Sequence, residues 1–191
     1  MGRRPHRLSR SGVAALCLLA LAYPAISARA ETAQSEYAVK AAFLYKLAAF
    51  VEWPASAADR AEPSLKLCVL GTNPFGDTLE QMTAGQRIGG LPIDVRRIDT
   101  VDRAAGCQVV YIASANAPAV SRTLQAVRGK PVLTVTDASL EDSARGIVHF
   151  VLKDSRVRFE IDPEAAARNG VVLSSKLISL AMPSRPRTFV R

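Results

Sequence analysis

The chain has 191 residues, 49% of them hydrophobic, and carries 25 Lys and Arg against 17 Asp and Glu. Five of the arginines lie in the first 30 residues, which hold no acid, so the other 161 residues have a net charge of only +3. The overall positive charge is therefore no argument for nucleic-acid binding. A chain of this length can form one domain with a sizeable core.

The first 30 residues have the order of a secretory signal peptide. Four arginines in the first ten residues are followed by the mostly apolar run SGVAALCLLALAYPAI and by ARA, an A-x-A pattern. We predict export and cleavage after Ala30, which leaves residues 31–191 as a single domain. The alternative is an uncleaved membrane anchor, but the apolar run is short for a spanning helix, which needs about 20 residues.

A helix is predicted over Tyr37–Trp53, ended by Pro54. At about 100° per residue, one face collects the apolar side chains that we expect to pack on a sheet, Phe43, Leu44, Leu47, Phe50 and Val51. The other side carries residues that we consider as a contact with another chain, Ala42, Tyr45, Ala49, Glu52 and Trp53. The alternative is full burial of the helix within the monomer.

Short apolar runs bounded by turn residues predict strands that alternate with helices. In chain order they are a strand over Leu65–Leu70, a helix from Pro74, an edge strand over Ile93–Ile98, a strand over Val109–Ala113, a helix over Pro118–Val127 and a strand over Val132–Val135. Strands and helices that alternate at this spacing form parallel βαβ units with right-handed crossovers.

An antiparallel hairpin is predicted next, with arms Ile147–Leu152 and Arg156–Ile161 around the turn Lys153–Ser155. Apolar and charged residues alternate in the second arm, so one face should be buried and the other solvated, the latter with Arg156, Arg158 and Glu160. Two short helices follow, Pro163–Asn169 with Gly170 as its stop, and Lys176–Ala181 capped by Ser174 or Ser175. The predicted fold is α/β, a three-layer sandwich with a mixed, mostly parallel sheet that ends in this hairpin.

Cysteine usage agrees with export. Cys17 lies in the predicted signal peptide, so the exported chain keeps only Cys68 and Cys107. An even pair in an oxidising compartment suggests a disulfide, which would close a loop of about 40 residues and stabilise the fold by about 4 kcal/mol. The alternative is two buried free thiols.

Few residues are suited to catalysis. His149 is the one histidine after residue 30, and a lone histidine in a strand is more often structural than a base or a metal ligand. No Ser-His-Asp set, zinc-ligand set or phosphate-binding glycine motif can be assembled. Asp137, Glu141 and Asp142 are interpreted as a solvated helix start rather than a metal cluster. We therefore expect no enzyme activity, no metal and no cofactor.

Arg156 and Arg158 point the same way from the last predicted strand, because side chains two residues apart share one face. They could pair with carboxylates or a phosphate, and Arg158 with Lys176 could hold a ligand at the sheet edge. The alternative, which we favour, is a charged edge that blocks the addition of another strand.

Two long segments resemble the YfiR-like periplasmic regulators. They are KAAFLYKLAAFVEWP, residues 40–54, and GIVHFVLKDSRVRFEIDPEAAARNGVVLSSKLISLA, residues 146–181. GKPVLTVTD, residues 129–137, and the strand with Cys68 also fit, in the expected order. The resemblance covers most of the chain after the signal peptide, which makes it far more specific than a short motif.

The resemblance implies a function. Such proteins sit in the periplasm and repress a membrane-bound diguanylate cyclase by binding its periplasmic sensor region, which lowers cyclic-di-GMP and limits biofilm formation. An outer-membrane OmpA-like lipoprotein can sequester the repressor. Members are dimers with an α/β fold and no chemistry of their own. Cys68 and Cys107 match a disulfide pair of the family, whereas the second pair of its better-known member, near the last hairpin, is missing from this chain.

Two other functions remain open from the sequence. One is a periplasmic small-molecule-binding module that tunes a different membrane sensor or a transporter. The other is an exported enzyme, which would need a measured activity that one polar substitution abolishes.

Overall fold

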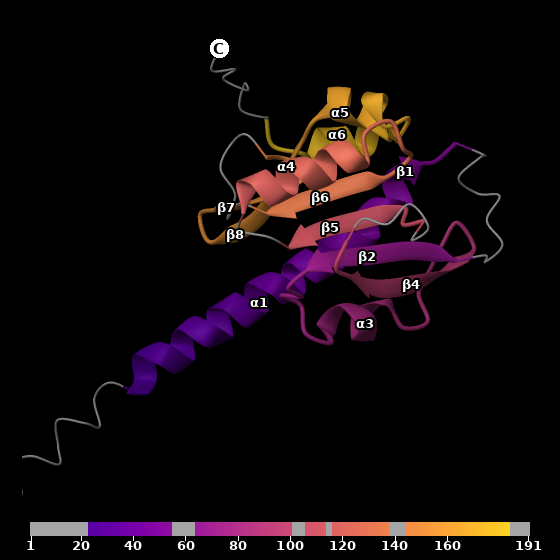
Figure 1. The fold of residues 1–191 in the computed structure, drawn as a ribbon. Coiled ribbons are helices and arrows are strands. Elements are labelled where there is room, and N and C mark those ends of the chain that lie inside the picture. Colours follow the sequence, from indigo (N-terminus) through magenta and orange to yellow (C-terminus); the bar gives the residue numbers. More distant parts are fainter. Residues whose placement is uncertain (1–22, 55–63, 101–105, 114–115, 138–143, 184–191) are drawn as a thin grey trace, which may run out of the picture. The chain divides into compact units, whose positions relative to one another are not determined.

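A computed structural model describes residues 23–54, 64–100, 106–113, 116–137 and 144–183 of the chain (Figure 1). The chain divides into two units, residues 1–35 and residues 36–191. Residues 1–22 lie outside the described residues, so the predicted signal peptide and its cleavage after Ala30 stay predictions. Side chains are described from Ala33 onwards.

Helices and strands follow one another in an order typical of α/β proteins. The helices are α1 (Tyr23–Leu47), the 3₁₀ turn η1 (Ala48–Phe50), α3 (Thr78–Thr83), α4 (Ala117–Ala126), α5 (Pro163–Arg168) and α6 (Ser175–Leu180). The strands are β1 (Val51–Glu52), β2 (Leu65–Gly71), β3 (Arg87–Ile88), β4 (Leu91–Ile98), β5 (Val109–Ala113), β6 (Leu133–Asp137), β7 (Val148–Lys153), β8 (Arg156–Ile161) and β9 (Val172–Leu173).

The main sheet has seven strands in the order β3-β4-β2-β5-β6-β7-β8. The strands from β4 to β7 pair in parallel, while β3 and β8 pair antiparallel with β4 and β7. The predicted mixed, mostly parallel sheet that ends in a hairpin is therefore confirmed. The parallel strands have the chain order 2-1-3-4-5, and in sheets of this order the switch point, here between β2 and β5, is the usual place for ligands at the carboxyl ends of the strands.

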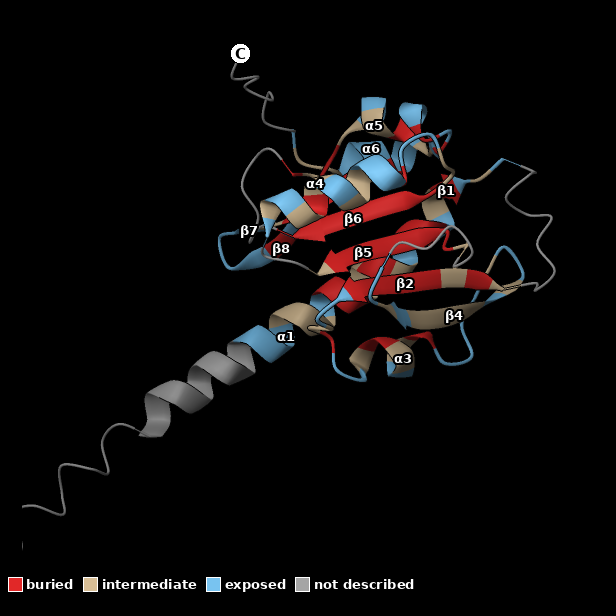
Figure 2. Ribbon diagram, in the orientation of Figure 1, coloured by how far each residue is buried: buried red, intermediate tan, exposed pale blue. Residues whose placement is uncertain are grey.

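Most residues of the central strands β2, β5 and β6 are buried, and they are coloured accordingly in Figure 2. In β2, Leu67 and Val69 belong to the larger apolar cluster, which includes residues of α1 and α3, while Cys68 and Leu70 belong to a second cluster with residues of α4. Successive side chains of a strand point to opposite faces, so α1 and α4 cover opposite faces of the sheet (Figure 1).

Cys68 and Cys107 form the predicted disulfide, with their Cα atoms 6.0 Å apart. Both residues are buried in the second cluster, where Cys68 comes from β2 and Cys107 lies two residues before β5. The bond therefore links the start of β5 to its neighbour in the sheet, and the alternative of two free thiols is wrong.

The first helix differs from its prediction at both ends. It begins at Tyr23 rather than at Tyr37. It stops being α-helical at Leu47, not at Trp53, and a 3₁₀ turn leads into β1. Val51 is extended, with φ −118° and ψ 133°, and pairs with Leu173 of β9. The amide of Ser174 also donates to the Phe50 carbonyl at 3.0 Å. A strand partner more than 120 residues away overrides the local helical pattern, because tertiary pairing outweighs a weak propensity.

Other boundaries moved for local reasons. The helix predicted from Pro74 begins at Thr78, because the Asn73 side chain accepts from the amide of Phe75 at 3.0 Å and donates to the carbonyl of Gly76 at 2.8 Å, which forms a turn. At the other end of the chain, Ser174 rather than Ser175 caps α6, since its hydroxyl accepts from the amide of Leu177 at 3.2 Å.

Candidate interaction and ligand sites

A buried polar cluster joins α1 to the sheet. Lys40 of α1 is only 2% exposed, and its ammonium donates to Asp137 at 2.7 Å and to Glu36 on the preceding helical turn. The Tyr111 hydroxyl donates to the same Asp137 oxygen at 2.8 Å. The Lys40 ammonium also lies 4.6 Å from the centre of the Tyr37 ring. One cationic donor and one hydroxyl donor therefore converge on one buried carboxylate.

The buried cluster raises the pKa of three of its members, Tyr37, Lys40 and Tyr111. Burial by itself would lower the pKa of Lys40, but the hydrogen bonds to Asp137 and Glu36 outweigh burial and raise that pKa above its ordinary value. Burial, together with the negative charge of Asp137, raises the pKa of Tyr111 far above its ordinary value and raises the pKa of Tyr37 as well. Lys40 therefore stays charged and both phenols stay neutral at physiological pH.

Asp137 corrects one prediction. The residue is 6% exposed and ends β6, so it does not belong to a solvated helix start; Glu141 and Asp142 lie outside the described residues. A signal for the buried pair was present in the sequence, because Lys40 shares a helix face with Leu44 and Leu47, and a charge on an apolar face needs a partner.

The buried cluster lies at the carboxyl edge of the parallel sheet, next to the switch point. Asp137 is the last residue of β6, and Tyr111 comes from the neighbouring β5. Open α/β sheets usually bind ligands at this edge, whereas here the ammonium of the chain's own Lys40 occupies the carboxylate. The cluster therefore fixes α1 on the sheet, which is a structural task.

His149 lies within the core, as its structural interpretation requires. It is buried in β7, and its Nδ1 is 2.9 Å from the Thr136 hydroxyl of the neighbouring β6. That hydroxyl also accepts from the amide of Gly146 at 2.9 Å. In the part of the chain that the structure describes, no three or more His, Cys, Asp and Glu side chains are grouped so that they could hold a metal ion.

The hairpin edge carries a basic cleft. Arg156 and Arg158 are exposed on β8, the last strand of the sheet, and they line a cleft of about 500 Å³. The full lining consists of Lys153, Asp154, Arg156, Arg158, Ala181, Met182 and Pro183. Three cationic side chains and one carboxylate therefore surround a space of the size that small molecules occupy.

Glu160 departs from the predicted polar face of β8. It is buried at 6% exposed and forms an ion pair with Arg145. The solvated face that the alternating pattern predicts is therefore limited to Arg156 and Arg158. The reason is a tertiary contact, because the backbone of Met182 forms a β-bridge with Glu160 and covers this half of β8.

Lys176 belongs to α6, and its ammonium lies near η1, which follows the first helix, rather than in the hairpin cleft. Its ammonium is 6.0 Å from the centre of the Phe50 ring, and it is not among the residues that line the cleft. The structure therefore places Lys176 beside Phe50 and not with Arg158. The ligand site that Arg158 and Lys176 would share stays a prediction without a contact to support it.

The first-helix residues that we considered as a partner contact differ in exposure. Ala49 and Glu52 are exposed, whereas Ala42, Tyr45 and Trp53 are half-buried. The predicted core face is confirmed where Leu44, Leu47 and Val51 are buried. Phe43 packs on the hairpin, with ring centres 6.3 Å from Phe150 and 5.9 Å from Phe159.

An exposed surface forms where β1 meets β9. Glu52 pairs with Val172, whose side chain is 59% exposed. The exposed Ala49 and Lys176 both lie beyond the other end of this strand pair, where Val51 pairs with Leu173. We call these residues, Ala49, Glu52, Val172 and Lys176, the β1–β9 surface. The indole Nε1 of Trp53, the residue after Glu52, is buried and has no hydrogen-bond partner among the described residues. Exposed apolar atoms beside charges of both signs are typical of contacts with other proteins.

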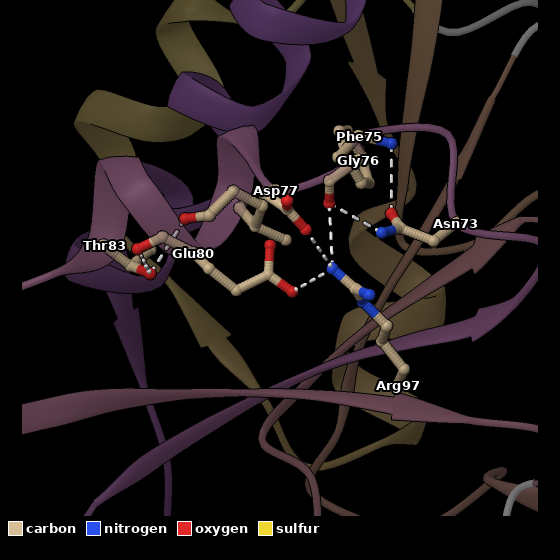
Figure 3. A network of polar contacts seen from close by, with 8 residues as sticks. Asn73, Phe75, Gly76, Asp77, Glu80, Thr83 and Arg97 are labelled. Atoms are coloured by element: carbon tan, nitrogen blue, oxygen red, sulfur yellow. Dashed lines mark hydrogen bonds and ion pairs between the residues drawn. The ribbon is translucent and has the colours of Figure 1, made fainter.

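A second polar network is structural. Arg97 of β4 donates to the carbonyl of Gly76 at 3.0 Å, to Asp77 at 3.2 Å and to Glu80 at 2.7 Å (Figure 3). Asp77 and Glu80 stand at the start of α3, so the guanidinium fastens that helix to the sheet. All three contacts come from one guanidinium nitrogen, Nη2, which is therefore fully engaged in holding α3.

The described residues thus form an α/β protein with a disulfide, a buried ion cluster and two candidate surfaces. The chain matches the family model of the YfiR/HmsC-like proteins over residues 37–182, and it belongs to this family. The match contains both segments on which the resemblance rests. The family indicates a periplasmic, non-catalytic regulator of diguanylate cyclase signalling. No helix in the described ranges is long and apolar enough to cross a membrane.

Proposed function

We propose that the protein represses a membrane diguanylate cyclase by binding its periplasmic sensor region, so that less cyclic-di-GMP is made. Membership of the YfiR/HmsC-like family over residues 37–182 is the observation that carries this proposal. The chain acts by binding and performs no reaction of its own. Export through the predicted signal peptide brings it to the compartment where the sensor region lies.

The β1–β9 surface is our choice for the contact with the cyclase. Val172 exposes an apolar side chain opposite the negative Glu52, and the positive Lys176 is exposed in the following helix, α6. Such a surface combines apolar burial with charges that select the partner. The neighbouring Trp53 is half-buried and adds an aromatic side chain, a residue type that often dominates binding energy.

We further propose that the protein forms a homodimer and that an outer-membrane OmpA-like lipoprotein can withdraw it from the cyclase. Ala42 and Tyr45 lie next to the β1–β9 surface along the chain and are only half-buried, which leaves them available for a second chain. Both partners follow from the family resemblance.

The first test is a pull-down. The protein purified from the periplasm, with its disulfide intact, is used to capture partners from detergent-solubilised membranes, and mass spectrometry identifies them. Recovery of a membrane diguanylate cyclase supports the proposal. Recovery of another sensor, such as a histidine kinase, would replace the cyclase as the target. An empty pull-down, together with unchanged cyclic-di-GMP in a strain that lacks the protein, would refute the proposal.

A charged substitution tests the surface. Ala49→Arg places a long cation at the edge of the β1–β9 surface, and we expect at least tenfold weaker capture of the partner. Ala126→Arg is the matched control, because Ala126 is also exposed at a helix end but lies on α4, at the opposite face of the sheet. Equal capture by both variants would exclude this surface as the contact.

A further inference from the structure

Three cations are held together at the tip and edge of the hairpin. Lys153 of β7 stands directly opposite Arg156 of β8 in the strand register, and Arg158 lies two residues further along β8. Directly opposite residues of an antiparallel pair share one face, as do residues two apart on one strand. The three side chains therefore rise from the same face of the hairpin.

This arrangement is unfavourable in the protein alone. Like charges directly opposite each other across a strand pair are destabilising. Among the residues that the structure describes, no carboxylate forms an ion pair with Lys153, Arg156 or Arg158. Local arrangements that cost stability without compensation are expected mainly at functional sites. A bound anion would provide the missing compensation.

The cleft beside these cations has the volume of a small-molecule site. Its volume of about 500 Å³ falls within the range of about 300–1,000 Å³ that is usual for such sites. Ala181, Met182 and Pro183 supply an apolar wall, and Asp154 in the turn is the one acid among the lining residues. The cleft thus offers an excess of positive charge at one side and aliphatic contact at the other.

We propose that the hairpin cleft binds a small polyanion, a molecule with two or more carboxylate or phosphate groups. Arg156 and Arg158 are two residues apart on β8, which is roughly 7 Å along a strand. Each would hold one anionic group of the ligand. Guanidinium groups suit this task because they form paired hydrogen bonds with carboxylate and phosphate oxygens. Lys153 adds a third charge, and Met182 contacts the carbon skeleton of the ligand.

An extended peptide fits this edge less well than a small molecule. The amide of Met182 donates to the carbonyl of Phe159 at 2.8 Å, so the chain itself already covers the second half of the β8 edge. Only Arg156–Arg158 remains for strand pairing, whereas strands usually have about five or six residues. A small ligand needs no such length.

Citrate is the probe for the test. Isothermal titration calorimetry at constant ionic strength compares the protein purified from the periplasm with Arg156→Gln/Arg158→Gln, and we expect at least tenfold weaker binding to the variant. Arg122→Gln/Arg128→Gln is the matched control, because both residues are exposed, both lie on or after α4 and the loss of charge is the same. The control should bind citrate like the parent protein.

Three results would overturn the proposal. The first is no measurable citrate binding to the parent protein at millimolar concentration, and the second is an equal loss of binding in both double variants, which would indicate a general charge effect. The third is tighter binding of a Glu-rich hexapeptide than of citrate, which would favour a peptide site. Circular dichroism establishes that each variant is folded, and Lys153→Gln provides a single-site variant with an intermediate expected loss.

Discussion

Two arginine-bearing strands lie towards opposite ends of the same sheet, and their arginines differ in whether carboxylates pair with them. On β4, Arg96 pairs with Asp94 at 2.7 Å and Arg97 pairs with Asp77 and Glu80 (Figure 3). On β8, neither Arg156 nor Arg158 has an ion pair within the described residues. The arginines of β4 therefore stabilise the fold, whereas those of β8 are available to a ligand. Only the presence of paired carboxylates distinguishes the two strands.

Lys40 differs most from the exposed, unpaired arginines of β8. It is buried and bound to two carboxylates, of which Asp137 is buried as well. Removing one member of a buried pair leaves an uncompensated charge in the core, whereas removing one member of an exposed pair changes little. The cost of losing a cation should therefore fall from Lys40 to the paired arginines of β4, and reverse in sign at the unpaired hairpin.

The largest expected effect is that of Lys40→Met. The change leaves Asp137 buried without its cation, and we expect the free energy of unfolding to fall by about 3–5 kcal/mol. Urea unfolding at pH 7 measures the loss. Lys46→Met is the matched control, because Lys46 lies on the same helix and is exposed. Similar losses for the two variants would mean that the buried pair contributes nothing beyond helix packing.

Tyr111→Phe should have a smaller effect that depends on pH. Asp137 loses one buried hydrogen-bond donor, which costs about 1–3 kcal/mol at pH 7. Burial and the charge of Asp137 raise the pKa of Tyr111 in the folded state above its ordinary value of 10.0. A raised pKa stabilises the fold fully below pH 10, and this contribution is lost as the pH rises further.

Alkaline unfolding therefore tests the cluster as a unit. The raised pKa values of Tyr37 and Lys40 act in the same direction as that of Tyr111, so the parent protein should lose stability steadily above about pH 10. Without the phenol of Tyr111, the loss should be less steep, and the difference between the two proteins should shrink between pH 8 and pH 11. A constant difference over this range would show that Tyr111 is not coupled to the charges.

The sequence predicted those parts of the fold that local patterns determine. The hairpin arms, the buried strand Val109–Ala113 and the stop at Gly170, whose φ is +65°, agree with the structure because each depends on neighbours in the chain. The pairing of β1 with β9 was missed, since nothing near Val51 indicates a strand partner far along the chain. Glu160 was misplaced for the same reason, because its partner Arg145 lies outside the hairpin.

The sequence predicts which residue types form the candidate sites, but not which of these residues lie together in the fold. Arg156 and Arg158 were found from their spacing on one strand, and the structure adds Lys153 through the register of the hairpin. Asp137 was taken for a solvent-exposed residue because its position at a strand end looks like a loop in sequence. A periodic pattern gives the face on which a side chain lies, but not which element packs against that face.

The smallest expected effect is a gain. Lys153→Glu turns the like-charge pair with Arg156 into an opposite-charge pair, and we expect the free energy of unfolding to rise by about 0.2–1 kcal/mol. Arg97→Gln, which breaks a paired arginine on β4, should instead cause a small loss. Thermal unfolding without added anions compares both variants with the parent protein. A loss of stability in Lys153→Glu would mean that the three hairpin cations do not repel one another, and the argument that they await an anion would then lose its energetic basis.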